Sequence, residues 1–185
     1  MQEALDRLAK VIIDNGLTVK SCEYNFEQAK WTEAGDGVTL GARADMLLRD
    51  DMGGKVIFDF KYSASQKFYK ELIENNHALQ LEFYRHMAKQ EFGKDTKVRV
   101  AYVLLPDVTI LTADEFDLPN GQEIIKVKNE RLDSDVIAEA ARAYRFRWEQ
   151  LKAGKIERVE GCVPGTGEYA SQIDEQLLFP LTTHK

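Results

Sequence analysis

The 185-residue sequence predicts an α/β sandwich in which helices flank a mixed β-sheet. Two observations support this prediction. Hydrophobic patterns of helical and of strand periodicity follow one another in the order helix, three strands, helix, two strands, helix. In addition, residues 98–105 (VRVAYVLL) form an almost continuous apolar run, which is typical of a central strand covered on both faces.

The first predicted elements are a helix over residues 2–14 and a strand over 17–31. Apolar residues recur at helical spacing through the helix and stop at an Asn-Gly pair, residues 15–16. Acidic and basic residues are interspersed along the same segment, which distinguishes it from a secretion signal.

The next two strands are predicted to form a hairpin. Residues 38–48 and 55–62 both have strand character, and a strong turn signal (DDMGG, residues 50–54) separates them. A short turn between two such runs favours antiparallel pairing.

The second half begins with a long predicted helix over residues 68–92, followed by the apolar strand and a short edge strand over 108–111. Residues 114–133 are polar and predicted to be irregular. A last helix is predicted from Ser134, as N-cap, to about Ala153. The residues assigned to its inner side are Val136, Ile137, Ala140, Ala141, Tyr144, Trp148 and Leu151. Residues 1–158 are therefore expected to form the domain, with 159–185 as a tail docked on it or on a partner.

Composition limits the function classes. The chain is 44% hydrophobic and 10% aromatic, which argues against disorder. No apolar run approaches the roughly 18 residues of a membrane span. Cys22 and Cys162 are too few for a disulfide framework, a four-cysteine zinc site or an iron–sulfur cluster. A soluble protein of the reducing cytoplasm is the expectation.

Charge is unevenly distributed around a net value of −6. Residues 61–100, which include Lys67 and Lys70, carry 8 Lys/Arg against 5 Asp/Glu. Residues 142–158, which include Arg142 and Arg145, carry 6 against 2. These segments form either a footprint for a polyanion such as nucleic acid or ordinary solvated helix faces.

The predicted hairpin brings together groups that can do chemistry. Asp45 and Asp59 are equidistant from residue 52 in the turn, so a symmetric hairpin places them opposite each other, with Cβ atoms roughly 5 Å apart. Lys61 lies two residues beyond Asp59 and shares its face. Facing carboxylates suit a hard divalent cation such as Mg²⁺ or Mn²⁺, and a nearby lysine stabilises charge on a phosphate. The alternative is that these are ordinary charges of a surface strand.

At these residues the sequence resembles the PD-(D/E)XK nuclease superfamily, and in particular its RecB-like exonuclease branch. Three motifs occur in order: Gly41-x-x-x-Asp45, then Ile57-Phe58-Asp59-Phe60-Lys61, then Gln80-x-x-x-Tyr84. The resemblance covers roughly residues 17–105 and implies the restriction-endonuclease-like fold. Two departures are the lack of four cysteines for an iron–sulfur cluster and of a histidine before the first motif.

The resemblance implies a role for each matching residue. Asp45 and Asp59 would be metal ligands, joined by the main-chain carbonyl of Phe60, and Lys61 would be the catalytic lysine. Gln80 and Tyr84 would line the active-site cleft and contact the substrate or orient the lysine. Glu23 matches an upstream glutamate of this branch, and either reaches the metal or is an exposed strand charge.

The resulting hypothesis is an Mg²⁺- or Mn²⁺-dependent deoxyribonuclease, exonuclease-like, that works in DNA recombination or repair. Lys67, Lys70, Arg142 and Arg145 would bind the DNA, and a helicase or another part of a larger recombination protein would be the partner. The alternative is a non-catalytic nucleic-acid-binding or assembly domain on the same fold, because one fold hosts many functions.

Overall fold

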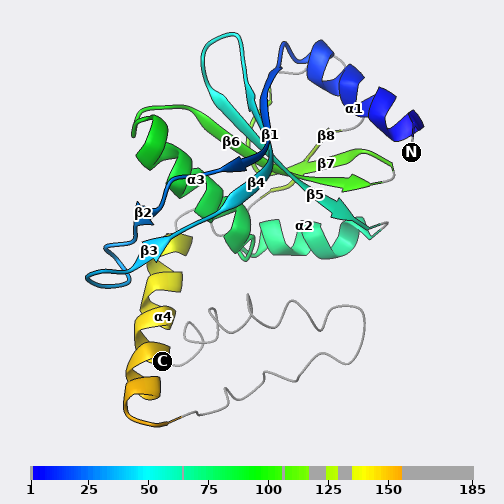
Figure 1. Cartoon of the computed structure of the whole chain (residues 1–185). Coiled ribbons are helices and arrows are strands. Elements are labelled where there is room, and N and C mark those ends of the chain that lie inside the picture. Colours follow the sequence, from blue (N-terminus) through cyan, green and yellow to red (C-terminus); the bar gives the residue numbers. More distant parts are fainter. Residues whose placement is uncertain (1, 64, 106, 117–123, 129–134, 156–185) are drawn as a thin grey trace. The chain divides into compact units, whose positions relative to one another are not determined.

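The computed structural model describes residues 2–63, 65–105, 107–116, 124–128 and 135–155 (Figure 1). Two compact units are distinguished. The first comprises Met1–Ala29 and Leu40–Leu132, and the second comprises Lys30–Thr39 and Asp133–Lys185. The predicted tail, residues 159–185, lies outside the described residues.

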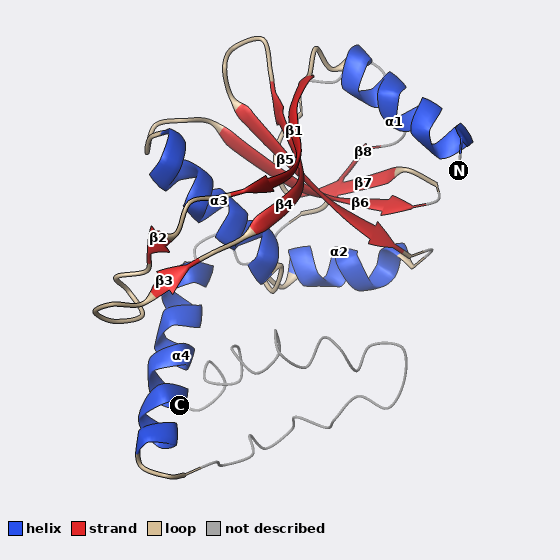
Figure 2. Cartoon of the chain, viewed as in Figure 1, coloured by secondary structure: helices blue, strands red, loops and turns tan. Residues whose placement is uncertain are grey.

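A six-stranded sheet forms the centre of the first unit (Figure 2), in the order β1-β4-β5-β6-β7-β8. Its strands are β1 (Thr18–Asn25), β4 (Arg43–Arg49), β5 (Lys55–Tyr62), β6 (Val98–Leu105), β7 (Thr109–Thr112) and β8 (Ile124–Lys126). β5 pairs in parallel with β6, and β7 with β8, whereas the other neighbours are antiparallel. The predicted mixed sheet and the predicted β4–β5 hairpin are confirmed.

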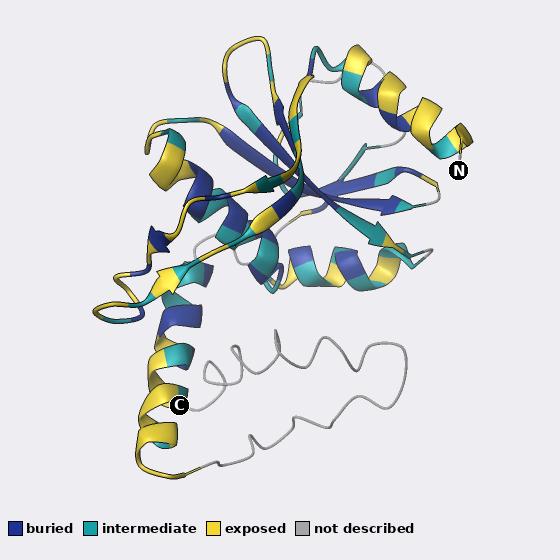
Figure 3. Ribbon diagram, in the orientation of Figure 1, coloured by how far each residue is buried: buried dark blue, intermediate teal, exposed yellow. Residues whose placement is uncertain are grey.

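Helices cover both faces of this sheet. α1 (Gln2–Asp14) packs Leu8 and Val11 into a core with Val56 and Phe58. α2 (Gln66–Glu74) and α3 (Leu79–Phe92) cover the opposite face in a second core. The sheet between these helices contains β6, in which every residue except the last, Leu105, is buried (Figure 3), as its apolar sequence predicts. The α/β sandwich is confirmed.

The single long helix predicted over residues 68–92 is wrong, because the chain forms two helices there. α2 ends at Glu74, and Asn76 adopts a positive φ of 59°. Asparagine is among the residues that adopt this left-handed conformation most readily, and it commonly ends helices. The break lets α3 start in a new direction, with Gln80 and Tyr84 in its first turns.

Three further strand expectations need correction. The strand predicted over 17–31 is divided into β1 and β2 (Ala29–Lys30), and the one over 38–48 into β3 (Thr39–Leu40) and β4. β2 and β3 pair as a separate two-stranded sheet. β7 is not an edge strand, because β8 pairs with it from within the segment predicted to be irregular. Three residues are too short a pattern to reveal a strand.

The second unit contains α4 (Val136–Lys152), which begins one residue later than predicted. Its N-cap is Asp135 and not Ser134, since the Asp135 carboxylate accepts a hydrogen bond from the Ala138 N–H at 3.0 Å. The predicted inner side is correct only at the start of the helix. Val136, Ala140 and Ala141 are buried, whereas Trp148 is 45% and Leu151 54% exposed.

Replacing the N-cap, Asp135→Ala, is expected to cost about 1 kcal/mol of helix stability, because one N-terminal N–H loses its acceptor. Urea denaturation followed by circular dichroism measures this loss. Asp135→Asn is the control and should retain most of the stability, since the amide oxygen can accept the same bond. An alanine variant as stable as the wild type would contradict the assignment of the cap.

No helix among the described residues is both long enough and apolar enough to cross a membrane.

Candidate active site

The two carboxylates lie at neighbouring positions of β4 and β5. The paired residues of the two strands run from Arg49↔Lys55 to Met46↔Phe58, and the next pair in this register is Asp45 with Asp59. The Asp45 carboxylate also accepts a hydrogen bond from the Phe60 N–H at 2.7 Å. Asp45 and Asp59 lie on the same face of the sheet as Leu47 and Ile57, two residues away along each strand, which belong to the core beneath α2 and α3. The hairpin therefore has the register that its symmetry predicts.

Asp59 is a buried charge that is only partly compensated. Its exposed fraction is 2%. Burial raises the pKa of this carboxyl above its ordinary value, the Lys61 ammonium opposes that shift, and the negative charge of Asp45 adds to it. Because the raised pKa favours protonation in the folded state, the ionised carboxylate destabilises the metal-free fold at neutral pH, and the cost disappears as the pH falls through that pKa.

The two oxygens of Asp59 have different surroundings. Oδ1 lies 3.2 Å from the Tyr84 hydroxyl, which can donate to it. Oδ2 lies 2.8 Å from Lys61 Nζ, but it is buried and accepts no hydrogen bond of good geometry from the described residues. The Lys61 ammonium offsets only part of the cost of burying this oxygen, because the pKa of the carboxyl is still raised overall.

Lys61 is held in place by the first turns of α3. Its Nζ donates to Gln80 Oε1 at 2.8 Å, and Gln80 Nε2 donates in turn to the Tyr84 hydroxyl at 2.9 Å. Gln80 and Tyr84 are four residues apart, so they lie on the same side of the helix. The lysine side chain is 27% exposed, so part of it is in contact with solvent. This series of hydrogen bonds connects Lys61, Gln80 and Tyr84, which are three of the predicted site residues.

Tyr84 links the helix to both strands of the hairpin. Besides Asp59, its hydroxyl lies 3.0 Å from the main-chain carbonyl of Arg43 in β4. Burial and the nearby negative charge of Asp59 raise the pKa of Tyr84, so the phenol stays protonated and acts as a donor. Arg43 is a contact that the sequence analysis missed, because a main-chain carbonyl carries no signal in the residue pattern.

Glu23 lies in β1, between the pairs Cys22↔Met46 and Tyr24↔Ala44. Its side chain is 70% exposed, and its carboxylate lies 3.4 Å from the Arg43 guanidinium. Its φ of 50° is uncommon for a residue with a side chain. Throughout the described ranges, no group of three His, Cys, Asp or Glu side chains is close enough to hold a metal ion.

The four predicted DNA-binding residues belong to different units. Lys67 and Lys70 lie on α2, where Lys67 is 86% exposed and Lys70 bonds to the Gln66 side chain. Arg142 and Arg145 lie on α4 of the second unit. Arg142 is 63% exposed, and Arg145 donates to the main-chain carbonyl of Glu33.

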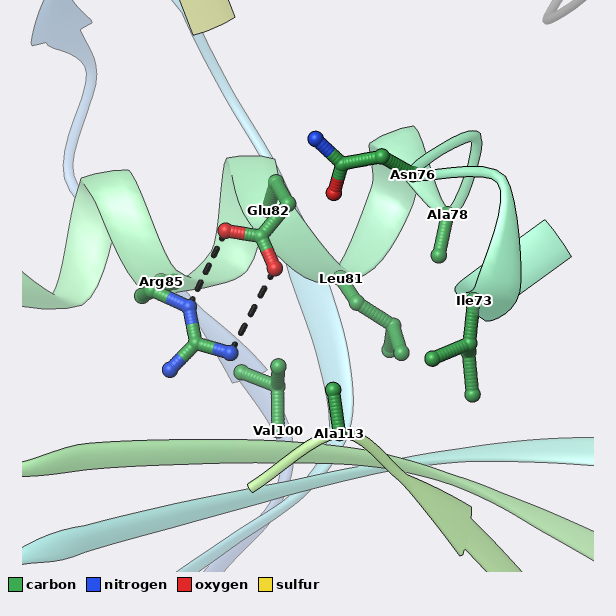
Figure 4. A pocket seen from close by; sticks show the side chains of 8 residues that line it. All are labelled: Ile73, Asn76, Ala78, Leu81, Glu82, Arg85, Val100 and Ala113. Carbon is green, nitrogen blue, oxygen red and sulfur yellow. Dashed lines mark hydrogen bonds and ion pairs between the residues drawn. The ribbon is translucent and has the colours of Figure 1, made fainter. Parts of the chain in front are cut away.

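A small cavity in the first unit lies apart from the candidate site, because none of Asp45, Asp59, Lys61, Gln80 and Tyr84 lines it (Figure 4). Its lining residues are Ile73, Asn76, Ala78, Leu81, Glu82, Arg85, Val100 and Ala113. Burial alone would lower the pKa of Arg85, but ion pairs with Glu82 and Asp114 raise it overall. The guanidinium also donates to the Val98 carbonyl, so its charge is used within the fold.

The chain was compared with known proteins. The family model described as the PD-(D/E)XK nuclease superfamily matches residues 1–164. That range contains the whole sheet and every residue of the site described above. No curated protein matches the chain.

Proposed function

Since the chain belongs to the PD-(D/E)XK nuclease superfamily, we propose that it is a divalent-metal-dependent deoxyribonuclease of exonuclease type, close to the RecB-like branch. Nucleases of this superfamily act on DNA and generally use divalent metal ions. The observation that carries the proposal is the buried, incompletely compensated carboxylate of Asp59 beside Asp45 and Lys61. A role in recombination or repair, alongside a helicase or within a larger protein, is part of the proposal.

The residues present fit a hard divalent cation. Asp45 and Asp59 offer carboxylate oxygens, and Asp59 Oδ2 is a buried acceptor without a directed donor. We assign these two aspartates and the Phe60 carbonyl as ligands, with Mg²⁺ or Mn²⁺ as the ion. Glu23 pairs with Arg43 in this structure, so it becomes a further ligand only if its side chain turns toward the aspartates. When bound, such an ion polarises the scissile phosphate and lowers the pKa of a water molecule.

Lys61 acts on the charge that develops in the transition state. Its side chain is partly exposed, and hydrogen bonding to Gln80 restrains its ammonium near the carboxylates. A positive charge fixed before the reaction needs little reorganisation when the phosphate gains negative charge. Gln80 and Tyr84 act as positioning residues, because they contact Lys61 and Asp59 respectively.

The proposal is tested with circular DNA and end-labelled linear DNA, with and without Mn²⁺. An exonuclease degrades the linear substrate from its ends and leaves the circle intact. Cleavage of the circle would overturn the exonuclease assignment while keeping the nuclease. If neither substrate is cut although calorimetry shows that the protein is folded and binds metal, the non-catalytic binding domain becomes the better interpretation.

Gln80→Ala is expected to reduce cleavage about 10- to 100-fold, a loss of about 1.4 to 2.7 kcal/mol of transition-state stabilisation. The lysine ammonium loses the acceptor that restrains it, so it is less often in the productive position. The measurement is kcat at saturating Mn²⁺. The melting temperature should change little, because Gln80 is only partly buried.

A matched control for this variant is Gln90→Ala, since Gln90 is an exposed glutamine on the same helix. This control should cleave at the wild-type rate. Full activity in Gln80→Ala would show that the amide does not position Lys61.

A further inference from the structure

One side of the second half of α4 combines aromatic and basic residues. Successive helical residues are rotated by about 100°, which places six side chains on this side and Arg142, Phe146 and Glu149 on the other. We call this side the α4 face, and its residues are Tyr144, Arg145, Arg147, Trp148, Leu151 and Lys152. The face contains no acidic residue. It continues the buried start of the helix into an exposed part (Figure 3).

Three aromatic rings of this unit lie one after another, the inner pair tilted and the outer pair stacked. Trp31, which is only 3% exposed, lies with its ring centroid 5.7 Å from that of Tyr144. Tyr144 in turn stacks on Trp148 at 6.3 Å, with an angle of 8° between the ring planes. Trp148 is the outermost ring and is 45% exposed. An exposed indole is therefore supported from below by two further rings, so little conformational freedom remains for a ligand to remove.

Positive charge surrounds the exposed indole. Residues 142–155 carry 5 Lys/Arg against 1 Asp/Glu, in a chain whose net charge is −6. Lys152 Nζ lies 5.8 Å from the centre of the Trp148 ring. The same ammonium is 2.8 Å from Glu149, but this pair is more than half exposed and therefore weak. A ligand with negative charges can replace it at small cost.

We propose that the α4 face binds single-stranded nucleic acid, with a base stacked on Trp148 and phosphates paired with Arg145 and Lys152. Exposed aromatic rings between basic side chains bind single strands because every base offers a flat face, and the backbone supplies the negative charge. In a duplex the bases stack on one another and are not available to the indole. The proposal names the substrate class of the proposed nuclease and, in that respect, rests on it.

Trp148 itself reports the contact. The chain has two tryptophans, so Trp31→Phe leaves Trp148 as the single tryptophan, whose fluorescence is excited selectively at wavelengths where tyrosine does not absorb. In EDTA, so that no cleavage occurs, a thymidine 12-mer is expected to quench this fluorescence. An oligomer of the same length without bases should bind more weakly and not quench, although its charge is identical. Equal quenching by both oligomers would overturn base stacking.

Affinity measured with the otherwise unaltered chain avoids any effect of the Trp31 substitution on folding. Anisotropy of the labelled 12-mer is expected to show about 5- to 150-fold weaker binding for Trp148→Ala, the range given by the loss of one stacked base. Trp148→Phe should recover most of the affinity. Phe146→Ala is the matched control, since Phe146 is equally exposed (46%) on the other side of α4, and it should change the affinity less than twofold.

Two results of the affinity measurements would overturn the proposal. They are unchanged affinity in Trp148→Ala and equal affinity for duplex and single strand. A concentration-dependent dimer that Trp148→Ala dissociates would assign the α4 face to a second copy of the chain instead. Single-strand binding without cleavage in Mn²⁺ would reject the proposed nuclease and leave the proposal for the α4 face standing. Cleavage with unaltered kinetics and affinity in Trp148→Ala would reject the proposal for the α4 face and leave the nuclease standing.

Discussion

Replacing Asp59 with asparagine is expected to abolish metal binding and to reduce cleavage by at least about 10³-fold, as is typical when a central group of a catalytic unit is removed. The substitution keeps the size of the side chain and removes the charge that a divalent ion needs. Calorimetric titration with Mn²⁺ and single-turnover cleavage of linear DNA measure the two effects. Wild-type cleavage by Asp59→Asn would contradict the proposed metal site.

The same variant is expected to be at least as stable as the wild type without metal. The pKa of Asp59 is raised in the folded state, so its ionised form lowers the stability of the metal-free protein once the pH exceeds that pKa. An uncharged amide carries no such penalty. In EDTA, the melting temperature of Asp59→Asn relative to the wild type should therefore rise as the pH increases from acidic to neutral. A variant that unfolds at neutral pH would make Asp59 a structural residue.

Asp45→Asn provides the matched comparison on the neighbouring strand. Its amide oxygen can still accept the hydrogen bond from the Phe60 N–H, so only the charge changes. We expect it, too, to lose metal binding and cleavage while remaining folded. Asp45→Ala removes that hydrogen bond in addition, and its stability should be lower than that of Asp45→Asn.

Lys61→Ala is expected to reduce turnover about 10²- to 10³-fold while changing the metal affinity only a few-fold. This is the usual effect of removing one group that stabilises transition-state charge. The ammonium lies 2.8 Å from Asp59 Oδ2, so its removal also leaves that buried carboxylate without a counter-ion. The metal-free variant should therefore be less stable, and saturating Mn²⁺ should restore its melting temperature.

Separate measurements of kcat and of metal affinity in Lys61→Ala distinguish a catalytic from a structural role of this lysine. If Lys61→Ala loses metal affinity and stability together, and Mn²⁺ does not restore either, the lysine is a structural counter-ion. Lys89→Ala, which alters an exposed lysine of α3, serves as the control and should cleave normally.

Much of the fold could be predicted, because local patterns determine it. The apolar run of β6 and the turn between β4 and β5 depend only on neighbouring residues, and both elements occur where predicted. The long helix failed at Asn76, where a positive φ interrupts an otherwise helical pattern. β8 was missed because its three residues are too short a pattern to reveal a strand, and it is defined by its pairing with β7.

By itself, the sequence determined which residues occupy the two strands of the hairpin and their common face. Strand alternation and the symmetry of the turn suffice to align Asp45 with Asp59 and to put Lys61 beside them. Only the tertiary structure decided how α3 completes the site. Because α3 packs on β6 and β5, it brings Gln80 to Lys61 and Tyr84 to both Asp59 and the Arg43 carbonyl. Burial of Asp59 beneath this helix, which raises its pKa, depends on that packing and on no local pattern.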